Sequence, residues 1–101
     1  NLMAISAEQK KAMRSIGHNL NPVVTIAGNG LSETVLEELN RALDDHELIK
    51  VRVSIGERDM RAQAIDDIIK ETGSELIQKI GKVALIVRRN PKAHPKLSNL
   101  S

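Results

Sequence analysis

Residues 48–55 carry the pattern that most constrains the fold of this chain. In the run LIKVRVSI, the apolar residues Ile49, Val51, Val53 and Ile55 alternate with Leu48, Lys50, Arg52 and Ser54. Successive side chains of a β-strand point to opposite faces of its sheet. The alternation therefore predicts a strand with one apolar face and one largely basic face.

The segment before residue 17 has the features of a helix. Ser6 and Gln9 match the capping-box pattern S-x-x-Q, in which each side chain binds the backbone amide of the other residue. We therefore predict a helix over about residues 7–16, with Gly17 in the C′ position where glycine commonly ends helices. Its core-facing residues are predicted to be Ala12, Met13 and Ile16.

Two further helices are predicted from their caps and apolar stripes. Ser32 can cap a helix whose inward stripe is Val35, Leu36, Leu39, Ala42 and Leu43. Asp59 can cap another helix, which ends at Gly73 and has Ala64, Ile65, Ile68 and Ile69 on its inward side.

Three shorter apolar runs complete the predicted sheet. VVTIA (23–27) follows Pro22 and is typical of a buried strand, while Gly81-Lys82 separates ELIQKI from VALIVR in the manner of a type II′ hairpin. The prediction is a single α/β domain of order αβαβαββ, with a four-stranded mixed sheet packed by helices. Residues 1–90 form this domain, and residues 91–101 form a flexible basic tail with two prolines.

Charge is segregated along the chain, although the net charge is only +2. Residues 33–47 hold six acidic residues and one arginine, whereas residues 76–101 hold six Lys and Arg residues and no acid. A surface polarised in this way favours a polyanion as the partner. The alternative is that helices and strands differ only in the charges that solvate them.

The absence of four residue types excludes several classes of function. Because the chain has no Phe, Tyr, Trp or Cys, its core must be aliphatic, and disulfides, thiol catalysis and Cys-bound metals are excluded. Base-stacking platforms like those of RRM sheets are excluded as well, since they need aromatic side chains. Nucleic-acid binding here must use charge, backbone amides and shape.

No pattern in the sequence indicates catalysis or a bound cofactor. His18, His46 and His94 lack partners at metal-ligand spacing, and Glu37-Glu38 and Asp66-Asp67 are typical of solvated helix faces. We therefore expect no enzymatic activity and no metal, cofactor or small-molecule substrate. Because no apolar run could span a bilayer and the N-terminus lacks a signal-peptide apolar region, we expect a cytosolic monomer that binds no membrane.

The turn Gly28-Asn29-Gly30 is the strongest candidate for a binding site. It leads from a predicted strand to the helix that begins near Ser32, a place where glycines leave backbone amides open to an anion. No G-K-S/T follows, so this is no P-loop, and Glu33 stands where the dinucleotide fingerprint needs a third glycine. The two interpretations are a phosphate-approach site and a purely structural turn.

Nearby cations would supply most of the affinity of such a site. The predicted contributors are Lys10, Lys11, Arg14, Arg58 and Arg88. His18 could donate to a phosphate or cap the first helix. Because Glu33 would repel a phosphate on the axis of its helix, we expect the ligand to pass the turn on the side of Lys10 and Arg14.

The chain resembles the bacterial YhbY family in two stretches, KKAMRSIGHNLNPVVTIAGNGLSETVLEELNRALDDHELIKVRV and ERDMRAQAIDDIIKETGSELIQKIGKVALIVRR. That family is the stand-alone form of the CRM domain (chloroplast RNA splicing and ribosome maturation). The resemblance covers nearly the whole chain. It rests on the L-x-P-V-V strand, the glycine loop, the H-E-L-I-K-V strand entry and the I-G-K-x-x-x-L/I-V-x-R hairpin.

The resemblance implies an RNA-binding domain whose partners are ribosomal RNA and precursors of the large ribosomal subunit. It also implies a fold similar to the C-terminal domain of bacterial translation initiation factor three, with a KH-like G-x-x-G loop. That loop falls on Ala27-Gly28-Asn29-Gly30, with Ala27 in place of the first glycine, while the register from Gly28 to Leu31 loses the last one. The alternative function is a protein-interaction adaptor that docks a basic ribosomal protein through its acidic helices.

Overall fold

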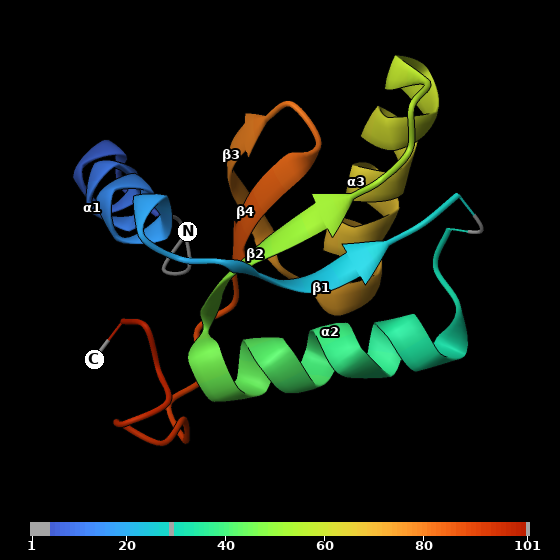
Figure 1. Ribbon diagram of the computed structural model, residues 1–101. Helices are drawn as coiled ribbons and strands as arrows, with labels where there is room; N and C mark the ends of the chain where they lie inside the picture. Colours follow the sequence, from blue (N-terminus) through green and yellow to red (C-terminus); the bar gives the residue numbers. More distant parts are fainter. Residues whose placement is uncertain (1–4, 29, 101) are drawn as a thin grey trace.

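The computed structural model describes residues 5–28 and 30–100 and has the predicted order of elements (Figure 1). The helices and strands are α1 (Ala7–His18), β1 (Pro22–Ile26), α2 (Glu33–His46), β2 (Leu48–Val53), α3 (Arg58–Thr72), β3 (Glu75–Ile80) and β4 (Val83–Val87). The α/β class, the αβαβαββ order and the mixed four-stranded sheet are thereby confirmed.

The strands lie in the order β1-β2-β4-β3. β1 pairs with β2 in parallel, and β4 pairs with both β2 and β3 in antiparallel orientation. The β3–β4 connection is the predicted hairpin at Gly81-Lys82, where Gly81 has a φ of 56°. β4 thus lies between β2 and β3, which brings the hairpin beside the end of β2.

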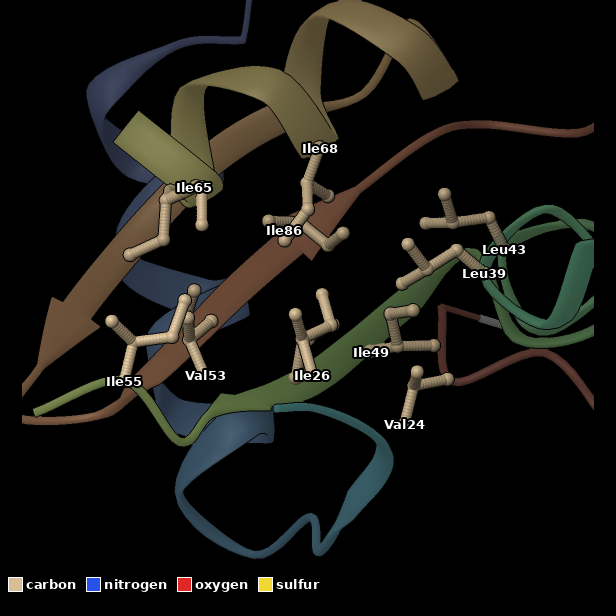
Figure 2. Close-up of a cluster of buried hydrophobic side chains, with 13 residues drawn as sticks. Val24, Ile26, Leu39, Leu43, Ile49, Val53, Ile55, Ile65, Ile68 and Ile86 are labelled. Atoms are coloured by element: carbon tan, nitrogen blue, oxygen red, sulfur yellow. The ribbon is translucent and has the colours of Figure 1, made fainter. Parts of the chain in front are cut away.

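The main core fills the space between one face of the sheet and the helices α2 and α3, which share that face (Figures 1 and 2). Its aliphatic side chains come from both helices and from three strands. The most deeply buried are Ile26, Leu39, Leu43, Ile49, Val51, Val53, Ile65, Ile68 and Ile86. The apolar face predicted for residues 48–55 is therefore the packed face of β2.

α1 packs against the opposite face of the sheet, over β2 and β3. Met13 is buried there with Leu48, Ile77, Leu85 and Val87. Leu48 lies on this face because it alternates with Ile49, which belongs to the main core. Of the three residues predicted to face the core from α1, only Met13 is buried; Ala12 and Ile16 are exposed.

Gly17 does not end α1 as predicted, because the helix continues through His18. A Cβ at Gly17 would lie 2.5 Å from the nearest methyl carbon of Leu85. The close approach of the helix to β4 therefore favours glycine at this position, and no left-handed cap is involved. The capping box is confirmed: Gln9 N donates to Ser6 Oγ, and Ser6 N donates to Gln9 Oε1.

Three further helix ends were predicted from the sequence, and two of these predictions are confirmed. Ser32 caps α2 by accepting from Val35 N, and Gly73 ends α3 in the left-handed conformation. The N-cap of α3 is Glu57, whereas Asp59 was predicted. Both carboxylate oxygens of Glu57 accept hydrogen bonds from backbone amides of the first turn. Glu57 directly precedes the helix, and its side chain, which is longer than that of aspartate, reaches these amides.

The segment after β4 lies against the end of α2 and the start of β2. Asn99 donates from its backbone N to His46 O at 2.9 Å and from Nδ2 to Leu48 O at 2.7 Å. Ser98 Oγ donates to the carboxylate of Glu47, which is 5% exposed. These are contacts at one end of the sheet; the predicted flexibility of residues 91–101 stays a prediction.

Candidate nucleic-acid interface

The β1–α2 turn reverses the chain over four residues. Gly30 N donates to Ala27 O at 3.0 Å, and Gly30 has a φ of 77°. Asn29, the middle residue of the predicted site, lies outside the described residues. Ala27 and Gly28 are exposed, and among the described residues no atom beyond the chain neighbours lies within 4 Å of the Cβ position of Gly28. The backbone of this turn is therefore accessible to a ligand.

Ala27 fits the position at which the G-x-x-G pattern has its first glycine. Among the described residues of this turn, Gly30 has a positive φ angle and Ala27 has none. An L-residue meets no backbone strain at Ala27 for that reason. The alanine consequently leaves the shape of the described part of the turn unstrained.

Hydrogen bonds join the turn to the other connections at the same end of the sheet. Ser54 N donates to Ile26 O, and Val53 N donates to Lys82 O. The end of β1, the end of β2 and the β3–β4 hairpin therefore lie side by side (Figure 1). Because neighbouring strands are about 4.8 Å apart, the backbones of β1 and β4 are separated by roughly 10 Å across β2, and the glycine turn continues beyond the end of β1. We call this region the loop end of the sheet.

A basic cleft opens at the loop end, between the start of α3 and the hairpin. It has a volume of about 380 Å³ and is lined by Arg58, Arg61, Ala62, Lys79 and Gly81. None of these lining residues is acidic. Two acids adjoin Arg58 in the chain, and neither lines the cleft: Glu57 directs its carboxylate at the backbone amides of its own helix, and Asp59 follows in the first turn of α3. The cleft is therefore a concentration of positive charge with a shape that can receive a phosphate.

Of the cations predicted to support the turn, Arg58 lies at this end, and the sequence prediction missed Arg61, Lys79 and Lys82. Arg61 is half-buried and donates from one terminal nitrogen to Ile55 O at 2.9 Å, which fixes its guanidinium at the mouth of the cleft. Lys79 and Lys82 flank the hairpin glycine and are exposed. The hairpin motif at Gly81-Lys82 was the one sequence signal that could have pointed to Lys79 and Lys82. Their position near α3, however, depends on the strand order of the sheet.

The predicted cations of α1 lie elsewhere. Figure 1 shows α1 and the β1–α2 turn on opposite sides of the molecule. Lys11 is exposed and Arg14 half-buried, while Lys10 Nζ lies 3.8 Å from Glu75 Oε2. The structure therefore does not bring Lys10, Lys11 and Arg14 together with the glycine turn. They form a second basic surface, which we call the α1 surface.

His18 and Arg88 also lie away from the turn. His18 is the last residue of α1 and lines a pocket on the face of the sheet that α1 packs against. Arg88 follows β4 at the end of the sheet opposite the hairpin. Neither side chain joins the glycine turn.

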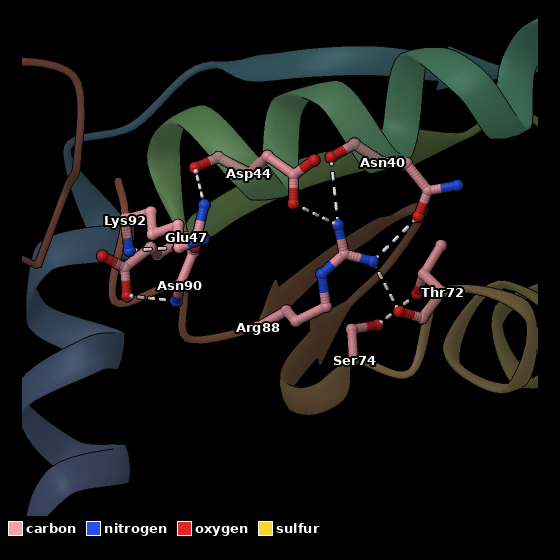
Figure 3. Close-up of polar contacts among 8 residues, drawn as sticks. All are labelled: Asn40, Asp44, Glu47, Thr72, Ser74, Arg88, Asn90 and Lys92. Carbon is pink, nitrogen blue, oxygen red and sulfur yellow. Dashed lines mark hydrogen bonds and ion pairs between the residues drawn. The ribbon is translucent and has the colours of Figure 1, made fainter. Parts of the chain in front are cut away.

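The guanidinium of Arg88 is used within the fold (Figure 3). One terminal nitrogen donates to Asn40 Oδ1 at 2.8 Å and to Thr72 O at 2.6 Å. The other donates to Asn40 O at 3.1 Å and to Asp44 Oδ1 at 2.9 Å. Arg88 therefore ties β4 to α2 and to the end of α3, and few of its donors remain for a ligand.

Acidic side chains collect on the other helical surface. A groove between the start of α2 and the outer side of α3 is lined by Leu31, Ser32, Glu33, Leu36, Asp67 and Glu71. Within residues 5–28 and 30–100, no group of three His, Cys, Asp or Glu side chains is arranged to hold a metal ion. No helix in the described part of the chain is long and apolar enough to cross a membrane.

Comparison with known proteins gives a consistent result. The protein-family model of the CRS1/YhbY (CRM) domain matches residues 5–88 of this chain. A probable RNA-binding protein of Pseudomonas aeruginosa is 54% identical, with 98% of this chain and 95% of the relative covered. An RNA-binding protein of Haemophilus influenzae is 38% identical, with 95% and 97% covered. The solution structure of a hypothetical protein from Staphylococcus aureus, described as a candidate RNA-binding protein, aligns with a TM-score of 0.76 at 30% identity over 88% of this chain and 93% of that one.

Proposed function

Because this chain belongs to the CRS1/YhbY (CRM) domain family, we propose that it binds structured ribosomal RNA through the loop end of its sheet and associates with precursors of the large ribosomal subunit. The observation that carries the proposal is the basic cleft at the same end of the sheet as an exposed glycine turn. The cations of the cleft attract the phosphate backbone, and the turn offers backbone amides at close range. Such contacts position RNA without reading its sequence.

The α1 surface would contact a second part of the same RNA. The domain measures 34 × 28 × 26 Å, and α1 lies across it from the turn. A folded ribosomal RNA is larger than this domain and can reach both surfaces. We therefore assign Lys11 and Arg14 to outer phosphate contacts, which contribute charge and less positional precision than the cleft.

Charge reversals on one helix provide a matched test. Arg58→Glu changes an exposed cation at the start of α3, and Lys70→Glu makes a similar change near the end of the same helix, away from the cleft. Binding of a labelled large-subunit rRNA fragment is measured for both variants. We expect Arg58→Glu to weaken binding about tenfold or more and Lys70→Glu to weaken it by less than about threefold. Equal losses in both variants would mean that only net charge matters.

The α1 surface is tested in the same assay with Lys11→Glu/Arg14→Glu. We expect this pair to weaken binding less than Arg58→Glu combined with Lys79→Glu, since Arg58 and Lys79 line the same cleft at the loop end. The cellular partner requires a separate experiment, in which the protein is crosslinked in growing cells and its RNA contacts are mapped. Crosslinks dispersed over messenger RNA, with none in large-subunit rRNA, would contradict the ribosomal part of the proposal.

The protein-adaptor function is a second candidate because of the groove between α2 and α3. Its lining combines three acids, Glu33, Asp67 and Glu71, with the apolar side chains of Leu31 and Leu36. A basic segment of a ribosomal protein would complement that surface. Asp67→Lys should then abolish protein capture and leave RNA binding unchanged, whereas the RNA proposal requires loss in Arg58→Glu.

A further inference from the structure

The face of the sheet that carries α1 is only partly covered by the helix. Beyond the buried cluster around Met13, the face continues through Lys50 and Arg52 of β2 and reaches Ile80 at the end of β3. Ile80 is 66% exposed although it is a large apolar side chain. This part of the sheet therefore presents aliphatic surface to solvent between cationic side chains.

A pocket of about 220 Å³ lies where the end of α1 meets this open surface. Its lining consists of His18, Lys50, Gln78, Ile80, Val83 and Leu85. Val83, Leu85 and Ile80 form the apolar part, and the other three residues supply polar groups. The lining contains no carboxylate. Gly17 contributes indirectly, because its missing side chain lets α1 approach Leu85 and places His18 at the rim.

The polar groups of the pocket are available to a ligand. Among the described residues, the structure records no hydrogen bond to the side-chain amide of Gln78 and no ion pair of Lys50. A side-chain amide offers both donors and an acceptor, and an ammonium offers donors only. The pocket thus combines an apolar slot, one amide able to hydrogen-bond a ring edge, and one positive charge.

We propose that this pocket receives a single unpaired nucleobase of the bound RNA, an inference that rests on the proposed function. The aliphatic side chains contact the faces of the base, Gln78 hydrogen-bonds its edge, and Lys50 binds the adjoining phosphate. The size agrees, because sites for drug-sized ligands have volumes of roughly 300–1,000 Å³, and this smaller pocket suits one ring system. The positive lining favours a polyanion over an acidic or neutral peptide.

The position of the pocket adds a binding mode that the basic cleft lacks. Cleft and turn contact phosphates, which carry no sequence information, whereas a base edge held by an amide does. A second hollow, lined by Val23, Asn99 and His46 among others, also contains Lys50 and continues the surface toward β1. An RNA strand leaving the pocket therefore has a path along the open sheet face.

The test uses the full chain, isotopically labelled, and mononucleotides as probes. We expect AMP, GMP, CMP or UMP to shift the NMR signals of the Gln78 amide and of the Ile80 and Val83 methyl groups. Ribose 5-phosphate, which has no base, should leave them in place. Shifts of equal size with ribose 5-phosphate, or none with any nucleotide, would overturn the pocket.

A matched pair of variants extends the test to RNA. Gln78→Met removes the amide at similar volume, and Gln63→Met makes the same change on the exposed side of α3. Binding is compared for RNA hairpins that differ only in one unpaired base. We expect Gln78→Met to reduce the preference among bases about 2- to 10-fold, as for loss of one hydrogen bond, and Gln63→Met to preserve it.

The outcomes separate the two proposals. In one outcome, Arg58→Glu loses RNA binding while Gln78→Met keeps the base preference of the parent. That result would reject the pocket and keep the proposed function. Nucleotide-specific shifts in a protein that fails to bind ribosomal RNA would support the pocket and reject the proposed function.

Discussion

Gly17 of α1 lies so close to Leu85 of β4 that a Cβ at Gly17 would come within 2.5 Å of a methyl carbon and 3.2 Å of Cγ. Leu85 is 2% exposed and packs under α1 with Met13. This contact sets the distance between α1 and the sheet.

Gly17→Ala is therefore expected to lower the free energy of unfolding. Alanine in a helix gains up to about 1 kcal/mol over glycine, but forcing a methyl group into a packed contact costs roughly 1–3 kcal/mol. We expect a net loss of about 1 kcal/mol by urea denaturation. Ser15→Ala, at an exposed position of the same helix, is the control and should be neutral or slightly stabilising. A more stable Gly17→Ala protein would show that Leu85 moves aside at no cost.

The two described glycines of the β1–α2 turn should respond differently to alanine. Gly30 has a φ of 77°, where an L-residue costs roughly 1–2 kcal/mol, so Gly30→Ala should be destabilised by about that amount. Gly28 has no positive φ and no atom near its Cβ position, so Gly28→Ala should retain parental stability. If the turn admits phosphate, Gly28→Ala is nevertheless expected to weaken RNA binding, because an added methyl group hinders the close backbone approach that glycine allows. Unchanged affinity in Gly28→Ala would make the turn purely structural.

Arg88 is expected to matter for stability. Its removal in Arg88→Met leaves the buried carbonyl of Thr72 and the side chain of Asn40 without their donors, which we expect to cost about 2–3 kcal/mol. Lys92→Met, at an exposed site nearby, should cost almost nothing. RNA affinity is then measured well below the melting temperature of each variant. A stable Arg88→Met protein with weakened RNA binding would restore the interpretation of Arg88 as an RNA contact.

Salt should weaken RNA binding steeply. Arg58, Arg61, Lys79 and Lys82 lie at the loop end, and neutralising about four phosphates on irregular RNA gives a slope of roughly −3 for log K against log salt concentration. Fluorescence anisotropy across a salt series measures the slope. Lys79→Glu should make the slope shallower by the contribution of about one phosphate contact. Affinity that is flat with salt would favour the protein-adaptor function.

Residues 91–100 are expected to contribute to stability through Asn99 and Ser98. A chain ending after Asn90 loses the bonds of Asn99 to His46 and Leu48 and the bond of Ser98 to Glu47. At about 1 kcal/mol for each well-formed bond, offset by the entropy of the released segment, we expect a net loss of about 1–2 kcal/mol. Calorimetry of the shortened and full chains checks this. Identical melting temperatures would support the predicted flexible tail.

Several features of this protein could be predicted from the sequence because their causes are local. The alternation in 48–55 depends only on the two-residue period of a strand, and the caps at Ser6 and Ser32 depend on residues three positions apart. The Gly81-Lys82 hairpin likewise joins strands adjacent in the chain. Element order and fold class followed from these signals, as did the glycine turn as a place of interest.

The tertiary structure alone decided which cations lie together. The insertion of β4 between β2 and β3 brings Lys79 beside Arg58, and the placement of α1 on the opposite face separates Lys10 from the glycine turn. No short-range pattern encodes either relationship, since both follow from pairing between distant strands. The same reason explains Gly17, whose role depends on Leu85 far along the chain, and Arg88, whose acceptors come from two helices. The sequence by itself determined the elements and their amphipathic faces, and long-range packing determined the surfaces on which their charges meet.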